Sequence, residues 1–188
     1  MHKEKKYGFT LAELMAVVII VAILAMLGAS YYRRAVEQSR FSEGLMAASA
    51  IAEGVNRLYM DLQAEGLTHE EILANMFPTG GNFDITRLDI SLPGTSCGRS
   101  VSHQCDTRYY HVMVWNGAIQ AGRRDGIYSD PMEGYRIHIE PHFAAANKDE
   151  ISCTVGRNNV ASKAFCESMG YTSCEERATG GWKCTKPW

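Results

Sequence analysis

A single carboxylate, Glu13, lies near the start of an otherwise uncharged apolar run over residues 9–30. A carboxylate at the centre of a bilayer costs about 2.5–3.5 kcal/mol on insertion scales, so an acid in such a segment is a functional group that needs a partner. A new N-terminal amine supplies that partner if the chain is cut between Gly8 and Phe9. The Glu13 carboxylate of one copy would then pair with the Phe9 amine of the next, since buried charges cost less when paired. We therefore predict that Glu13 sets the register in which copies assemble.

Cysteines are the second group of reactive side chains, and all six follow the apolar run: Cys97, Cys105, Cys153, Cys166, Cys174 and Cys184. An even number of cysteines beyond a membrane segment indicates disulfides formed outside the cytoplasm. Six cysteines allow many connectivities. Because each pair closes a short stretch of chain, we favour the sequential bridges Cys97–Cys105, Cys153–Cys166 and Cys174–Cys184.

Zinc is the alternative for the first pair, because Cys97, His103, Cys105 and His111 lie close together in the sequence. Their spacings do not follow the paired Cys-x-x-Cys or His-x(3–5)-His of structural zinc sites. Disulfides are therefore preferred over a metal site.

Other chemical functions find little support in the sequence. His138 and His142 are four residues apart, but a strand followed by Pro141 does not place them on one helical face. No phosphate-binding loop, serine nucleophile elbow or zincin motif is present. The formal net charge of −2 argues against a nucleic-acid partner, which requires a basic face. We expect no metal, no cofactor, no nucleic acid and no enzymatic activity.

The residues around the apolar run, KKYGFTLAELMAVVIIVAIL, resemble the prepilin-peptidase (class III) signal of type IV pilins and type II secretion pseudopilins. The resemblance includes a short basic leader, Gly8 before the cut, Phe9 after it and Glu13 as the fifth mature residue. It implies that an inner-membrane prepilin peptidase cleaves after Gly8 and methylates the Phe9 amine. Many members have a proline near the end of the run, where this chain has Ser30, so any local melting there depends on Gly28.

A secretory signal peptide is the competing interpretation of the N-terminus, with cleavage after Ala29 and a mature chain that begins at Ser30. The apolar run is longer than the usual h-region of about 7–15 residues, and Glu13 lies inside it. Roughly 20 apolar residues are enough to span a bilayer.

The elements that position these residues begin with one long helix over residues 9–64, roughly 84 Å at 1.5 Å per residue. Its second half carries an apolar stripe at steps of four and three: Phe41, Leu45, Ala48, Ala52, Val55, Tyr59 and Leu62. Gly44 and Gly54 suggest close packing of this helix, because glycine inside a helix costs up to about 1 kcal/mol against alanine.

The remaining pattern is that of short elements separated by turns. A capping box at Thr68–Glu71 starts a helix over 68–77, and an extended connector follows over 83–94. The later predictions are strands at 108–115, 118–122, 134–140 and 150–156, a hairpin turn at Asn116–Gly117, a helix over 158–170, and a terminal hairpin that turns at Gly180–Gly181.

These patterns predict an α+β fold: a long N-terminal α-helix, membrane-spanning in its first half, packs on a small antiparallel β-sheet head with a disulfide-bonded C-terminal region. The predicted divisions are a leader (1–8, removed), a transmembrane half-helix (9–30), an amphipathic half-helix (31–64) and a globular head (65–188).

The resemblance implies a structural subunit of a type IV pilus, inserted in the bacterial inner membrane with its head outside the cytoplasm and then assembled into a helical filament. Alternatives are a pseudopilin of a type II secretion system, a minor or priming pilin, and an anchored binding module that does not polymerise. The implied partners are copies of itself, related pilins, the prepilin peptidase, an inner-membrane assembly platform and membrane lipid.

Overall fold

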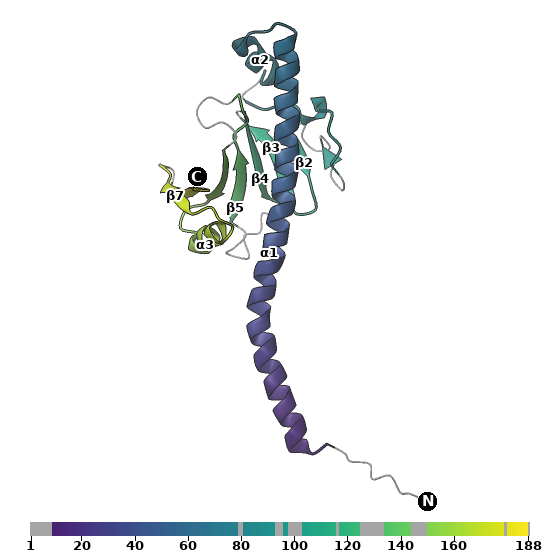
Figure 1. The fold of residues 1–188 in the computed structure, drawn as a ribbon, viewed down its shortest axis with the longest axis vertical. Coiled ribbons are helices and arrows are strands. Elements are labelled where there is room, and N and C mark those ends of the chain that lie inside the picture. The colour runs from purple at the N-terminus through teal and green to yellow at the C-terminus, as the bar shows by residue number, and fades with distance from the viewer. Residues whose placement is uncertain are drawn as a thin grey trace, which may run out of the picture. The chain divides into compact units, whose positions relative to one another are not determined.

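A computed structural model describes residues 9–78, 81–92, 96–97, 103–115, 117–124, 134–143, 150–178 and 180–187. The chain divides into two compact units, residues 1–39 and residues 40–188. Figure 1 shows the long helix, labelled α1, and the sheet that belongs to the second unit.

The long predicted helix is confirmed as α1, Leu11–Ala64. It ends in a Schellman motif, in which the Gly66 N–H donates to the carbonyl of Gln63 (3.0 Å) and the Leu67 N–H to the carbonyl of Leu62 (3.3 Å). Gly66 has φ +94°, a left-handed conformation that glycine adopts without a steric penalty. Two of the last carbonyls of the helix, those of Leu62 and Gln63, are thereby satisfied.

A short helix follows, α2 at His69–Met76, and its predicted capping box is confirmed. The Glu71 N–H donates to Thr68 Oγ1 (3.4 Å), and the Thr68 N–H donates back to Glu71 Oε2 (2.8 Å). These hydrogen bonds hold the pKa of Glu71 below its ordinary value. The predicted extended connector is interrupted by a 3₁₀ turn, η1 at Ile85–Arg87, because the Asp84 carboxylate accepts from the Thr86 N–H (3.0 Å).

The described strands form one antiparallel sheet of eight strands in the order β1-β2-β3-β4-β5-β6-β8-β7. Their bounds are β1 Ser96–Cys97, β2 Gln104–Asp106, β3 Tyr110–Trp115, β4 Ala118–Arg123, β5 Tyr135–Ile139, β6 Ile151–Val155, β7 Ser173–Glu176 and β8 Trp182–Thr185, with helix α3 at Val160–Ser168 between β6 and β7. The four predicted strands, the helix before β7 and the terminal hairpin are confirmed. β1 and β2 were not predicted.

The predicted turn between β3 and β4 lies partly outside the described residues, since Asn116 is not among them. The strands on its two sides pair with Trp115 opposite Ala118. This register is that of a two-residue hairpin.

The head core lies between the sheet and residues 40–64 of α1, which run along one face of the sheet (Figure 1). The sheet contributes the alternating inward side chains of three strands: Tyr110, Val112, Val114, Ile119, Ala121, Tyr135, Ile137 and Ile139. The predicted helical stripe is confirmed, since its members are buried or pack against the core, and Ile51 joins them.

Two glycines of α1 let the helix approach its neighbours closely. A Cβ atom at Gly44 would lie 2.8 Å from the ring of Tyr110, and one at Gly54 would lie 3.0 Å from the side chain of Ile90. The Tyr110 ring is itself fully buried, and its hydroxyl lies 2.5 Å from that of Tyr135. The expected close packing at these glycines is thus present.

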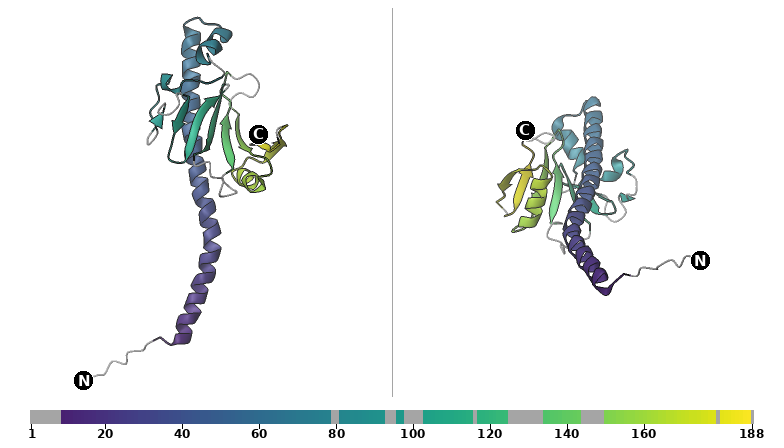
Figure 2. Two further views of the ribbon diagram at one scale, coloured as in Figure 1. Left: turned by 180° about the vertical axis from the view of Figure 1, so that it is seen from behind. Right: turned by 60° about the horizontal axis from the view of Figure 1, so that its bottom comes forward.

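Helix α3 packs on the same face of the sheet as α1. The Phe165 ring of α3 stacks on Tyr135 at 5.0 Å between centroids and meets Phe41 of α1 edge-on at 5.9 Å. Figure 2 shows α3 beside the C-terminal strands in both views. The opposite face of the sheet carries the alternate, mostly polar side chains, among them Arg136 and His138 on β5.

Candidate functional site

Glu13, which the sequence analysis placed at the centre of assembly, closes the first turn of α1. The Thr10 N–H and hydroxyl both donate to Glu13 Oε2 (2.8 Å each), and the Glu13 N–H approaches Thr10 Oγ1 at 3.3 Å. This is a reciprocal capping arrangement, which stabilises the start of a helix by satisfying free backbone donors.

The sequence analysis missed this role of Thr10, although the spacing Thr10-x-x-Glu13 is the capping-box signal. Capping explains why an acid or amide suits position 13, but a neutral glutamine also fits a capping box. Capping therefore does not require the charge. The Phe9 side chain is 80% exposed, and Gly8 lies outside the described residues. Pairing of Glu13 with the Phe9 amine of another copy stays a prediction.

The helix that follows Glu13 presents large apolar side chains to its surroundings. Their exposed fractions range from 53% at Val17 to 79% at Met26. An 18-residue window within α1 is long and apolar enough to cross a membrane, and none of it is buried. A contiguous apolar surface of this kind marks contact with lipid or with other protein.

Position 30, where the family resemblance leads to an expected proline, is helical. α1 continues through Gly28 and Ser30, and the Ser30 hydroxyl donates to the carbonyl of Leu27 (3.1 Å). In this chain the serine satisfies its own hydroxyl within the helix and leaves the backbone ladder continuous.

The six cysteines form three disulfides in the described part of the chain, and the pairs are the same sequential ones that the sequence analysis favoured. Cys97–Cys105 joins β1 to β2, and Cys174–Cys184 joins β7 to β8 across directly opposed positions. Cys153–Cys166 ties β6 to α3, and both residues are fully buried.

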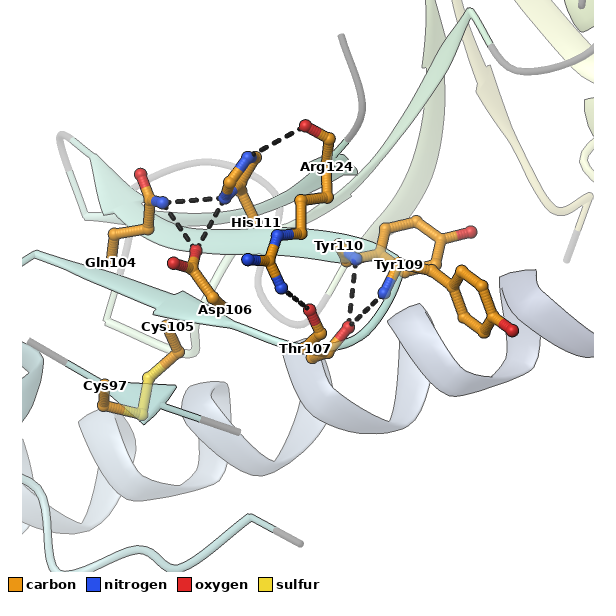
Figure 3. Close-up of polar contacts among 9 residues, drawn as sticks. All are labelled: Cys97, Gln104, Cys105, Asp106, Thr107, Tyr109, Tyr110, His111 and Arg124. Carbon is orange, nitrogen blue, oxygen red and sulfur yellow. Dashed lines mark hydrogen bonds and ion pairs between the residues drawn. A yellow bond between two sulfur atoms is a disulfide. The ribbon is translucent and has the colours of Figure 1, made fainter. Parts of the chain in front are cut away.

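The zinc alternative does not fit the region around the first disulfide. Both sulfur atoms of Cys97 and Cys105 are bonded to each other, so neither is a thiolate ligand. Nδ1 of His111 lies 2.6 Å from Oδ1 of Asp106, and its Nε2 lies 3.1 Å from the carbonyl oxygen of Arg124 (Figure 3). No group of three or more metal-ligating side chains occurs among the described residues.

Instead, these residues brace the edge of the sheet (Figure 3). Gln104 donates to Asp106 Oδ1 at 2.6 Å. Burial raises the pKa of Asp106, but hydrogen bonds from His111 and Gln104 outweigh it and hold the pKa below its ordinary value. Arg124 donates to the carbonyl of Thr107 (3.1 Å). The arrangement fastens β2, β3 and β4 together and offers no nucleophile or open ligand position.

The N-terminal segment is the part of the chain that matches a known protein family. Residues 4–29 match the family model described as the prokaryotic N-terminal methylation motif. The chain carries the prepilin signal of type IV pilins and pseudopilins. This prepilin signal covers the Gly8–Phe9 junction, Glu13 and most of the exposed apolar segment.

The rest of the chain lies outside the prepilin signal. Comparison with curated proteins and with solved structures gave no match. The findings therefore support a type IV pilin-like or pseudopilin protein, and the prepilin signal together with the apolar helix is consistent with membrane anchoring.

Proposed function

We propose that the protein is a structural subunit of a type IV pilus. The prepilin peptidase cleaves it after Gly8 and methylates the amine of Phe9. The subunit then resides in the bacterial inner membrane as a single-pass protein with its head outside the cytoplasm. An inner-membrane assembly platform packs it, with other copies and related pilins, into a helical filament.

The observation that carries this proposal is the prepilin signal on an exposed apolar helix, followed by a head with a complete core and disulfides. The apolar segment has no described partner that covers it within its own unit, so lipid and then neighbouring helices are its natural surroundings. The three disulfides favour a head outside the cytoplasm, where such bonds persist. The matched motif is of a structural rather than an enzymatic type, which supports a role without catalysis.

Assembly assigns a second role to Glu13 beyond capping. In the monomer its carboxylate is engaged by Thr10. In a filament, the positive Phe9 amine of a neighbouring copy would come close to the same carboxylate, because each charge is much less costly in an apolar filament core when the other is near. The capping bonds to one oxygen, Oε2, hold the carboxylate at the start of the helix for this contact.

Substitutions can separate the capping role from the charge role. Glu13→Gln retains a side chain that suits a capping box but removes the charge, whereas Thr10→Ala removes the capping hydroxyl and retains the charge. If the charge drives assembly, Glu13→Gln is processed and inserted but yields no filaments, and Thr10→Ala still assembles. The measurement is the amount of subunit in the sheared cell-surface fraction relative to the membrane fraction. Loss of assembly in Thr10→Ala with normal assembly of Glu13→Gln would contradict the charge role.

A pseudopilin of a type II secretion system is the second candidate, because the prepilin signal is shared by both classes. The two differ in where the assembled protein is found. A pilus subunit is released when surface filaments are sheared, whereas a pseudopilin, or a minor priming subunit, stays with the cell envelope. If the protein is anchored in the membrane but never assembles, Glu13→Gln should leave its location and function unchanged.

A further inference from the structure

The face of the sheet turned away from α1 contains a hollow of about 540 Å³. Its floor comes from β3 to β6, where Gly122 lies opposite Arg136 and Arg136 lies opposite Thr154 across the strands. The left view of Figure 2 looks at the sheet from the side opposite α1. We name this feature the arginine hollow, after three of the residues that line it: Arg136, Arg157 and Arg177.

The charged side chains of the described residues that line the arginine hollow are basic. Among the described residues that line it, none is an aspartate or a glutamate, although the whole chain has a formal net charge of −2. Among the described residues, Arg136 and Arg177 have no ion-pair partner. Guanidinium groups gathered in a concave surface create a positive potential that attracts anions.

Two carboxylates near the arginine hollow, those of Glu140 and Glu150, form ion pairs with a lysine. A smaller adjoining hollow shares Arg136 and Arg177 and also includes Lys183. The Lys183 ammonium lies 3.3 Å from Glu140 Oε1 and 2.8 Å from Glu150 Oε1. These two acids therefore neutralise Lys183, and neither forms an ion pair with Arg136 or Arg177.

Glycines leave room for the polar side chains of the arginine hollow to lie flat on the backbone. A Cβ at Gly180 would lie 2.6 Å from Nε of Arg157. A Cβ at Gly134 would overlap the amide of Asn159. The hollow is thus formed by side chains that the backbone already accommodates, which lowers the ordering cost of binding.

We propose that the arginine hollow binds a small molecule or chain end that carries two or more oxyanion groups, either carboxylates or phosphates. Its volume is within the range of small-ligand sites, about 300–1,000 Å³. The planar guanidinium groups of Arg136 and Arg177 suit bidentate contact with carboxylate or phosphate oxygens. Thr154, Gln120 and Asn159 add neutral polar groups to the lining. This binding goes beyond the proposed filament role and does not depend on it.

The test is calorimetric titration of the mature full-length protein in nonionic detergent with pyrophosphate and, separately, with citrate at matched ionic strength. We expect saturable binding of at least one probe. Binding of pyrophosphate alone identifies a phosphate site, binding of citrate alone a carboxylate site, and binding of both a general oxyanion site. Absence of saturable binding by both probes up to about 10 mM, weaker than most specific ligand sites, would overturn the proposal.

Two variants and one control assign the binding to the arginine hollow. Arg136→Gln and Arg177→Gln should each weaken binding about tenfold or more, as expected for a lost charge-assisted hydrogen bond. Arg57→Gln removes an exposed arginine on α1, outside the arginine hollow, with the same change in charge, and should leave binding unchanged. Equal weakening by all three would show attraction to overall charge and overturn the site. Unfolding curves for the variants that match the wild type establish that the head remains folded.

Discussion

The two units of the chain differ in how far their apolar side chains are buried. Residues 11–39 belong to α1, and the large apolar side chains of residues 11–32 are exposed, up to 79% at Met26. Residues 40–188 contain a buried apolar core, in which Phe41, Ile51 and Val55 of the same helix are essentially inaccessible. The head therefore has its own core, whereas the N-terminal segment needs lipid or other copies.

This difference separates the effects that mutations can have. Changes in the N-terminal segment should affect processing and assembly and leave the stability of the head unchanged. Changes in the head should alter the free energy of unfolding and leave processing intact.

The largest effect is expected at the cleavage junction. Gly8→Leu should block cleavage and methylation together, because a bulky residue then stands directly before the proposed cleavage site, where the prepilin signal has a glycine. The measurement is the intact mass of the protein, which should retain the leader. Gly28→Ala, a second glycine substitution in the same segment, serves as the control and should be processed normally. A Phe9 N-terminus in Gly8→Leu would show that the junction is misplaced.

The next largest effect concerns the buried disulfide of the head. Replacing Cys153 and Cys166 together with alanine should lower the free energy of unfolding by about 2–5 kcal/mol, the usual cost of removing a native disulfide. Urea unfolding in detergent, followed by tryptophan fluorescence, measures the change. The matched pair Cys97 and Cys105 closes a shorter segment, 8 residues apart instead of 13, and should cost less. Unchanged stability without Cys153–Cys166 would show that packing alone holds α3 on the sheet.

A glycine pair compares the two units directly. Gly44→Ala should lower the free energy of unfolding by about 1–3 kcal/mol, as overpacking does, because the new methyl group would meet the buried Tyr110 ring. Gly28→Ala places its methyl group in open space and should leave head stability unchanged. Similar unfolding curves for both variants would contradict the close approach of α1 to β3.

The smallest effect is a pH dependence at His138, which lies on the polar face of β5. Burial lowers the pKa of His138, and Lys183 and Arg177 lower it further, while Glu140 and Glu150 act in the opposite direction. The folded state thus binds fewer protons than the unfolded state just below the ordinary histidine pKa of about 6.5. Stability should therefore fall as the pH drops below that value.

Replacement of His138 isolates this contribution. In His138→Gln the decrease in stability between about pH 7 and pH 5.5, the range in which an ordinary histidine titrates, should be smaller than in the wild type. Urea unfolding at several pH values measures it. An identical pH dependence in both proteins would assign the decrease to other groups.

The parts of the fold that depend on local patterns could be predicted from the sequence. Alternation of apolar and polar residues in GYRIHIE is the pattern of a strand with Ile137 on one face and Arg136 on the other, and the structure buries Ile137 and exposes Arg136. The Thr68–Glu71 spacing predicted the start of α2. Each of these patterns lies within a few neighbouring residues, so it can be recognised in the sequence without knowledge of tertiary contacts.

Two kinds of feature could not be predicted in the same way: local turns that replace an expected extended chain, and groups of residues that come together only through tertiary contacts. η1 arises because Asp84 bonds to the Thr86 backbone, and this local turn competes with an extended chain. β1 is only two residues long and exists through its pairing with β2. The arginine hollow joins Arg136 and Arg177, which lie far apart in the sequence and meet only in the folded sheet.

The most direct test of the account is intact-mass and N-terminal analysis of the wild-type protein from sheared cell-surface filaments and from membranes, side by side. The account predicts a chain that begins at methylated Phe9, present in the sheared fraction. The same species confined to membranes would favour the pseudopilin or priming subunit. A start at Met1 or at Ser30 in both fractions would contradict processing at Gly8 and, with it, the proposed role of the N-terminal segment.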